Sequence, residues 1–523
     1  MRRLTVQLAW LAASLCLFAP ATARADWLRA ESDRFVVYSE DSESALREYV
    51  QKLEIFDQAM LYSFGQSIDT LPVRKMQIYL VGNRRGLLRV NPQSGASTVG
   101  TYFPTEEDIF AVAITGDDEG MSGEAVLMHE YAHHFMLNNL PGAYPAWFVE
   151  GFAEYYMNAD IDVRRQRIRL GGSNPNRVAA IFRESWIPLE DLLTKRLGQV
   201  EDDDAQATYY PIAWLLTHWF YSEPERLEQL RRYLTLVSEG VESREAMERA
   251  TGLSLNALKQ ALKAYTRAPQ TVSDLSGQFH VAEVQITRLP RSANDLLLIN
   301  QRLKVGVPEA DRADLGQEVA RLAARHGEDP LALLAAGHAG LHFGDRPAGV
   351  RALTRLVEIE PDHVEALQYL AQDKLRQADD AEDGGDALRR EARALLARAY
   401  AAGDNDYRTL VLLTELRQAQ SDFPNENDML TMGLALDRAP QLPAIRFQYA
   451  AALAHLDRRE EAISVLRPLS NSPHGGGASA YAARAIAALS AGEDFPSSGV
   501  QDEEPEGEPP GGAEPTPEEP DVD

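Results

Sequence analysis

The stretch His129-Glu130-Tyr131-Ala132-His133 decides how the chain is interpreted, together with the later run Pro145-Ala-Trp-Phe-Val-Glu150-Gly-Phe-Ala-Glu154-Tyr-Tyr156. Residues four apart share one face of an α-helix, so His129 and His133 can direct two imidazoles at one ion. Glu130 stands one residue further round and can hold a water beside that ion without binding the ion itself. The pattern predicts a helix that carries two ligands of a zinc-type metal site.

Composition places the chain among ordinary globular proteins. It has 523 residues, of which 45% are hydrophobic and 25% are charged, enough for roughly two to four domains. The net charge is −27, and residues 493–523 hold 12 acidic and no basic residues. This Pro-, Glu- and Gly-rich tail cannot bury a core and is expected to be disordered. An acidic chain without a basic stripe predicts no nucleic-acid partner.

The N-terminus has the three parts of a bacterial secretory signal peptide. Arg2 and Arg3 precede an apolar run over 4–20, and Ala23-Arg24-Ala25 supplies small residues at a cleavage site. Cleavage before Asp26 is predicted, which would remove residues 1–25 and send the mature protein to the periplasm or outside the cell. A membrane anchor is the alternative, but a span needs about 20 apolar residues and this run is shorter.

Cysteine usage limits the chemistry further. Cys16 is the only cysteine, and it lies inside the predicted signal peptide. The mature chain would then contain no disulfide, and any metal would be bound by His and carboxylate side chains. No second apolar run is long enough to span a membrane.

Hydrophobic patterning predicts an α+β domain over residues 26–268. Apolar residues at alternating spacings of three and four predict a helix that begins near Ser42 and reaches Met60. The stretch 108–114 is apolar on both faces, which is typical of a strand covered on both sides. Strands are also expected at 35–38 and 76–81, and further helices at about 177–195, 207–221, 224–238 and 254–266.

A second, all-α domain is predicted over residues 301–492. Residues 269–300 break the helical pattern with prolines and a glycine, and they are predicted to be a linker. Beyond them, residues 330–363 fit a 34-residue helical pair that resembles the tetratricopeptide (TPR) repeat, and a second copy fits from about 443. These copies predict a TPR-like solenoid, with a generic helical bundle as the alternative.

The two halves of the metal motif together carry a family resemblance. A third histidine after the motif is excluded, because Met136 and Asn139 stand where metzincins have Gly and His. The pairing of His-Glu-x-x-His with Trp147-x-x-Glu150-Gly-x-Ala-Glu154 instead resembles the gluzincin clan of zinc peptidases. That clan contains thermolysin, aminopeptidase-N-like enzymes and the peptidase MA-like domains of exported bacterial proteins, and the resemblance covers roughly residues 26–268.

This resemblance implies a Zn²⁺ cofactor bound by His129, His133 and Glu150. Glu130 would be the general base, and Glu154 would lie behind the ligands and accept a hydrogen bond from a ligand histidine. Glu154 in place of Glu150 as the third ligand is the alternative.

Related aminopeptidases also stabilise the oxyanion with a tyrosine that opens a later helix. The matching segment here is Thr208-Tyr209-Tyr210-Pro211, in which Tyr209 is the predicted residue. Tyr210 and His218 are alternatives, and a tyrosine in an aromatic-rich helix is commonly part of the core.

The substrate is less well defined by the sequence. The Gly-x-Met-Glu-Asn stretch with which aminopeptidases bind a free amine is absent; Glu106, Glu107 and Asp108 occupy a loosely similar place, which a surface turn explains equally well. The strand at 108–114 is a candidate edge along which a peptide adds as an extra strand.

The predicted function is that of an exported zinc metallopeptidase, a hydrolase acting on a peptide or protein substrate. The main alternative is a non-catalytic or weakly catalytic scaffold that binds protein partners on its helical repeats. A hydrolase of a non-peptide bond is a third possibility.

Overall fold

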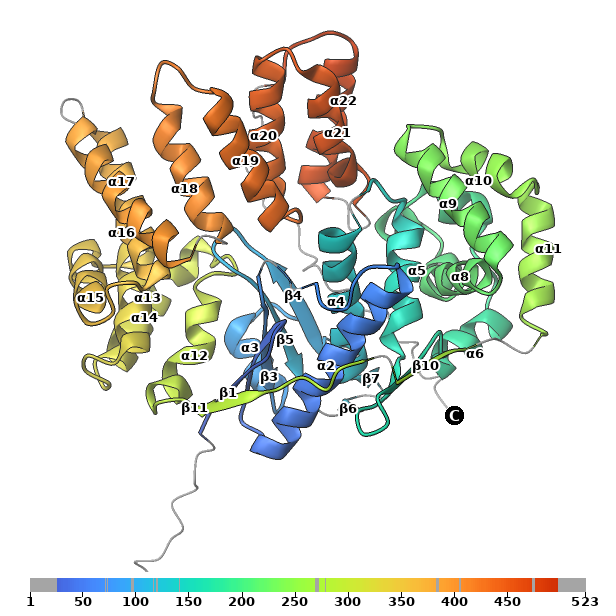
Figure 1. The fold of residues 1–523 in the computed structure, drawn as a ribbon, viewed down its shortest axis with the longest axis horizontal. Coiled ribbons are helices and arrows are strands. Elements are labelled where there is room, and N and C mark those ends of the chain that lie inside the picture. Colours follow the sequence, from blue (N-terminus) through green and yellow to red (C-terminus); the bar gives the residue numbers. More distant parts are fainter. Residues whose placement is uncertain are drawn as a thin grey trace, which may run out of the picture.

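The computed structural model describes residues 26–496, except for residues 71, 73, 96–97, 116, 119–120, 141, 269–271, 278, 382–384, 404–405 and 473–475. The predicted signal peptide and most of the predicted acidic tail lie outside the described residues. The described chain is mostly helical, with a small mixed sheet near its N-terminus and many helices in a repeat-like arrangement (Figure 1). None of its helices is long and apolar enough to cross a membrane.

The main sheet has six strands in the order β11-β1-β2-β3-β5-β4. Strands β2, β3 and β5 are parallel to one another, and the outer strands are antiparallel to their neighbours. The three predicted strands are confirmed as β2, β3 and β5. The strands are β1 Leu28–Glu31, β2 Phe35–Ser39, β3 Met76–Val81, β4 Gly100–Pro104, β5 Ile109–Ile114 and β11 Gln285–Arg288.

Side chains from alternate positions of the central strands enter two separate cores. Ile78 and Leu80 of β3 face the core built by α2 (Glu43–Ser63), α4 (Gly123–Asn139) and α5 (Ala146–Met157). Tyr79 and Val81 face the opposite side, against α3 (Arg84–Val90) and α12 (Ser292–Arg302). The predicted double coverage of β5 is therefore confirmed, because both faces of the sheet carry helices.

The edge of the sheet differs from the prediction. β5 lies between β3 and β4, so it cannot accept an added peptide strand; β4 is the edge strand on this side. β4 was not recognised in the sequence, because a five-residue strand with one polar position gives little alternation. It packs against α4, the helix that carries the metal motif.

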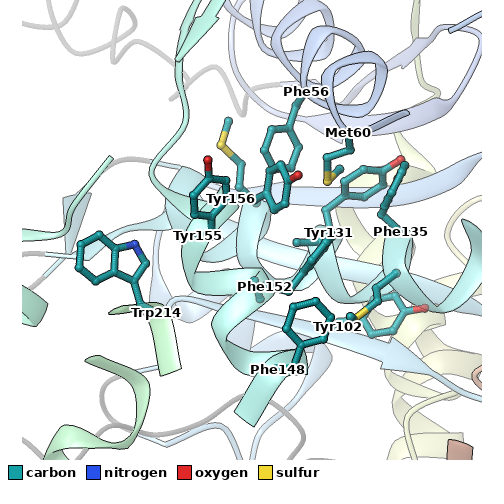
Figure 2. Close-up of a cluster of buried hydrophobic side chains, with 14 of the residues drawn as sticks. Phe56, Met60, Tyr102, Tyr131, Phe135, Phe148, Phe152, Tyr155, Tyr156 and Trp214 are labelled. Carbon is teal, nitrogen blue, oxygen red and sulfur yellow. The ribbon is translucent and has the colours of Figure 1, made fainter. Parts of the chain in front are cut away.

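The core between the sheet and helices α2, α4 and α5 is rich in aromatic side chains (Figure 2). Phe56 of α2, Tyr131 of α4 and Phe152 of α5 belong to it, and Tyr131 donates a hydrogen bond to Asp57 at 2.7 Å. Burial raises the pKa of Asp57 to about 6, against the opposing effects of the Tyr131 hydrogen bond and the Arg34 guanidinium. This contact fixes the middle of the metal motif to helix α2.

The described residues between 272 and 300 are part of the N-terminal fold and not a plain linker. β10 (Ser273–Ser276) pairs with β9 (Arg167–Leu170), and β11 pairs with β1 to complete the main sheet. The backbone between them is bound by side chains of α2: Arg47 donates to Val284 O and Gln58 to His280 O. These long-range contacts override the local Pro and Gly signals that suggested a linker.

Helices and two small sheets complete the N-terminal part. Helix α9 is confirmed at the predicted 224–238, whereas the predicted helix 177–195 is divided in two because Pro188 interrupts it. Helix α10 was not expected. The elements are β6 Asp117–Asp118, β7 Met121–Ser122, β8 Asp160–Asp162, β9 Arg167–Leu170, α6 Pro175–Arg183, α7 Leu189–Thr194, the short 3-10 helix Leu197–Gln199, α8 Asp203–Tyr221, α9 Pro224–Ser238, α10 Ser243–Thr251 and α11 Leu255–Tyr265.

The C-terminal part consists of successive helices packed against their neighbours. Both predicted helical pairs are present, as α14–α15 and α20–α21. Gly349 stands where a TPR has Ala; a Cβ there would lie 2.8 Å from the Gly337 carbonyl oxygen, so the two helices cross at close range. The helices are α13 Glu309–Ala323, α14 Pro330–Phe343, α15 Arg346–Ile359, α16 Val364–Asp380, α17 Gly385–Ala402, α18 Tyr407–Gln418, α19 Glu426–Arg438, α20 Pro443–His455, α21 Arg459–Ser470 and α22 Gly476–Ser490.

These helices form an arc over the N-terminal part (Figure 1). Its last members return to the region of α4 and α5: Gln441 donates to the Tyr102 hydroxyl of β4 at 3.2 Å, and Asn471 donates to Ala143 O at 3.3 Å. The helical part therefore contacts both the edge strand and the loop between the two motif helices.

Candidate metal centre

Helix α4 places the two motif histidines side by side. Their Nε2 atoms are 3.1 Å apart, and their ring planes are inclined by 87°. His133 is buried and the side chain of His129 is 14% exposed. One turn of helix thus directs two imidazole nitrogens at a single point that solvent can still approach.

Glu150 reaches the same point from helix α5. Its Oε2 lies 3.5 Å from Nε2 of His129 and 3.6 Å from Nε2 of His133. Two ligands held about 2.0–2.1 Å from a zinc ion in tetrahedral geometry are about 3.3 Å apart, close to these separations. Two imidazoles and one carboxylate are also a donor set that zinc accepts, so the residues fit the metal that the sequence predicts.

Glu154 lies behind the ligands, one turn after Glu150. Its Oε1 is 3.7 Å from Nδ1 of His129, the nitrogen on the far side of that ring. Arg177 of α6 binds the same carboxylate in a bidentate manner, with two N–O distances of 2.9 Å. Glu154 is almost fully buried, so the guanidinium supplies the charge that its burial requires.

Close packing of α5 against α8 sets the position of both carboxylates. Gly151 lies between them, and a Cβ at this position would be 2.3 Å from the Thr217 Oγ1 and 2.5 Å from the Ala213 carbonyl oxygen. Only glycine allows the two helix backbones to approach this closely. In the Glu150-Gly151 pair, Glu150 is the candidate metal ligand, and Gly151 is required by the close packing of α5 against α8.

Glu130 lies next to the first histidine and is partly exposed. Desolvation raises the pKa of its carboxyl to about 7; the His133 imidazole opposes this shift, and Glu150 adds to it. A carboxylate with such a pKa can both accept and return a proton near neutral pH.

The structure favours Tyr210 over Tyr209 as the tyrosine of the site. Tyr209 is buried, and its hydroxyl donates to the Lys195 carbonyl oxygen at 3.0 Å. The ring of Tyr210 lies 6.4 Å from the ring of His129, and the Arg177 guanidinium lies over it at 5.1 Å. The two side chains differ in their contacts because a one-residue shift on a helix turns a side chain by about 100°. The catalytic role of Tyr209 stays a prediction.

His218, His134 and the acidic residues 106–108 have partners outside the ligand group. His218 is buried among aromatic rings with Nδ1 2.7 Å from the Tyr265 hydroxyl. His134 packs against Tyr102 and Tyr131. The acidic residues 106–108 are not a simple surface turn, because Asp108 is buried and forms ion pairs with Arg74 and Lys304.

Arg177 was missed in the sequence. Asn174 and Pro175 mark the start of its helix, but no local pattern shows that this helix packs beside α8 and faces Glu154. Its role depends on a contact between residues 23 positions apart. Such contacts become visible only in three dimensions.

Comparisons with known proteins assign no family to the chain. No protein-family model matches the chain, and no curated protein matches it. A solved structure, that of a thermophilic TPR protein from Thermus thermophilus, is similar to 38% of this chain and is covered over 99% of its own length. The sequence identity is 18% and the TM-score is 0.33.

Proposed function

We propose that the chain is an exported zinc-dependent peptidase of the gluzincin type. The observation that carries the proposal is the convergence of His129, His133 and Glu150 on one point, with Glu130 beside it. Among the described residues this is one of two such groups, and the pairing of its helices matches the two-part motif in the sequence. The predicted signal peptide supports the exported location.

The proposed mechanism assigns one task to each side chain. His129, His133 and Glu150 would hold the zinc ion, which supplies an acidified water and a positive charge for the substrate carbonyl. Glu130 accepts a proton from the attacking water on its carboxylate and delivers it to the leaving amine. The Tyr210 hydroxyl donates a hydrogen bond to the oxyanion. Arg177 and Glu154 keep the His129 ring in place.

Removal of the metal is the direct test of this proposal. We expect the purified mature chain to contain zinc, and its peptidase activity to fall to background after dialysis against a chelator. Adding zinc back should restore the activity, because the protein ligands stay in place. The measurement is metal analysis beside cleavage of a peptide library. Cleavage that continues at full rate in the metal-free protein would contradict the mechanism.

Arg177→Gln is expected to weaken metal binding without removing a ligand. The substitution leaves the buried Glu154 carboxylate without its bidentate partner, and loss of such an outer contact typically lowers metal affinity or activity about 10- to 100-fold. Zinc affinity measured by competition with a chromogenic chelator checks this. Arg183→Gln, at an exposed position of the same helix, is the matched control and should behave as wild type.

A second candidate function is polypeptide binding by the helical part. A cavity of about 610 Å³ lies between helices α18 and α20, and apolar side chains such as Val411, Leu442 and Ile445 line it together with Glu106. A concave surface of this kind suits an extended segment of a partner or substrate protein. A zinc-loaded protein that binds partner polypeptides and cleaves none would favour this function over the peptidase.

A further inference from the structure

Helix α14 carries a second histidine pair with the spacing of the first. His338 and His342 are four residues apart, their ring centroids are 4.9 Å apart and their planes are inclined by 86°. The corresponding values for His129 and His133 are 4.7 Å and 87°. The two helices therefore present their histidine rings in nearly the same relative arrangement.

A carboxylate from another part of the fold completes this second group. Glu107, in the loop between β4 and β5, places Oε2 3.2 Å from Nε2 of His338. One ligand atom from each of Glu107, His338 and His342 lies within 4.8 Å of the other two. The separation of 3.2 Å is close to the roughly 3.3 Å between neighbouring tetrahedral zinc ligands.

Tyr369 of α16 sets the protonation of His338. Its hydroxyl donates to Glu107 Oε2 at 2.5 Å and lies 3.0 Å from Nδ1 of His338. Because the single hydroxyl proton goes to Glu107, the tyrosine oxygen accepts a hydrogen bond from Nδ1–H of His338. In the neutral ring, the unprotonated Nε2 then lies beside the Glu107 carboxylate. Two acceptors at 3.2 Å need a cation between them.

The surroundings of the two Nε2 atoms, one on His338 and one on His342, favour a metal ion over a proton as the cation. His338 is fully buried, and Nε2 of His338 and Nε2 of His342 are both buried without a hydrogen-bond partner among the described residues. A proton between His338 and Glu107 would satisfy only the first of these nitrogens. A metal ion would satisfy both, together with the carboxylate.

Neighbouring positive charges lower the metal affinity expected for Glu107, His338 and His342. Arg408 lies 3.9 Å from Glu107 Oε2. Two N–H groups of Arg376 lie 3.4 Å from Nδ1 of His342, which leaves the proton of the neutral ring on Nε2; binding a metal through Nε2 therefore requires the other tautomer and the loss of this contact. Lys304 is neutralised by Glu365 and Asp108. At the first site, the Arg177 guanidinium is bound to Glu154. A metal ion at the second site should therefore bind more weakly than one at the first.

We propose that Glu107, His338 and His342 form a second site for a transition-metal ion of the zinc class. The ion would connect α14 of the helical part to the loop that joins β4 and β5. β4 is the edge strand packed against α4, so this connection would hold the helical arc against the strand beside the candidate active site.

Metal counting on the full mature chain tests the proposal. After equilibration with zinc and removal of free metal, we expect two equivalents in the wild type, one in His342→Gln and one in His133→Ala. His342 is partly exposed, so its replacement is less disruptive than replacement of the buried His338. His455→Gln removes an exposed histidine of α20 and is the control for adventitious surface binding, with two equivalents expected.

The outcomes separate the two sites. A wild type with one equivalent that His342→Gln leaves unchanged would overturn the second site and assign a proton to His338. Two equivalents that fall only in His455→Gln would overturn it as surface binding. One equivalent that is lost in His342→Gln and kept in His133→Ala would support the second site and contradict the proposed function. Circular dichroism of each variant checks that it is folded.

Discussion

Glu130→Gln should keep its zinc and lose about 10²- to 10⁴-fold in the rate of peptide cleavage, the usual contribution of general acid–base catalysis. Glu130 contributes no atom to the group formed by His129, His133 and Glu150, so the metal ligands are unchanged. Glutamine has nearly the same shape as glutamate but cannot take a proton from the attacking water. The measurement combines metal content with kcat/KM on a peptide found in the library screen.

The control for this variant lies on the same helix. Glu124 forms an ion pair with Lys52 in the first turn of α4, and its side chain is 34% exposed. Glu124→Gln should therefore retain both zinc and activity. A Glu130→Gln protein that still cleaves at the wild-type rate would show that another group acts as the base. If this variant instead loses zinc, Glu130 has a role in binding the metal.

Local spacing explains why much of the candidate site could be predicted. A four-residue separation on a helix fixes which side chains share a face, and this relation holds wherever the helix is placed. His129 with His133, and Glu150 with Glu154, were therefore identified as pairs from sequence alone. The same reasoning succeeded for helix α2 and for the helical pairs of the C-terminal part, whose patterns are also local.

The remaining features depend on contacts between distant segments. β11 joins the sheet next to β1, more than 250 residues earlier in the chain, and its pattern alone resembled a linker. The edge position of β4 follows from strand order, which sequence periodicity does not specify. Glu107 looked like part of a surface turn because its partners, His338 and Tyr369, belong to the helical part. Long-range packing decided each of these cases.

The neighbouring tyrosines show the limit of prediction by alignment to a family. Tyr209 and Tyr210 are adjacent in the segment that matches the family, so the motif alone cannot decide which of them faces the metal ligands. The structure separates them by their partners: one hydroxyl binds a backbone carbonyl, and the other ring faces His129. Desolvation also keeps the pKa of Tyr210 well above its usual value, with contributions from Glu150 and Glu154, so its hydroxyl stays protonated as a donor at neutral pH.

Tyr210→Phe should lower kcat by about 10²- to 10³-fold with little change in KM, the effect expected when one oxyanion donor is removed. The ring remains, so its contact with the Arg177 guanidinium is kept and zinc content should not change. Tyr209→Phe is the matched variant: it removes a buried hydrogen bond worth about 1 kcal/mol of folding stability and should leave kcat near the wild-type value. Steady-state kinetics and thermal unfolding of both proteins measure these effects. The reverse pattern, with the larger loss of kcat in Tyr209→Phe, would return the oxyanion role to Tyr209 and require that its hydroxyl leave the Lys195 carbonyl during turnover.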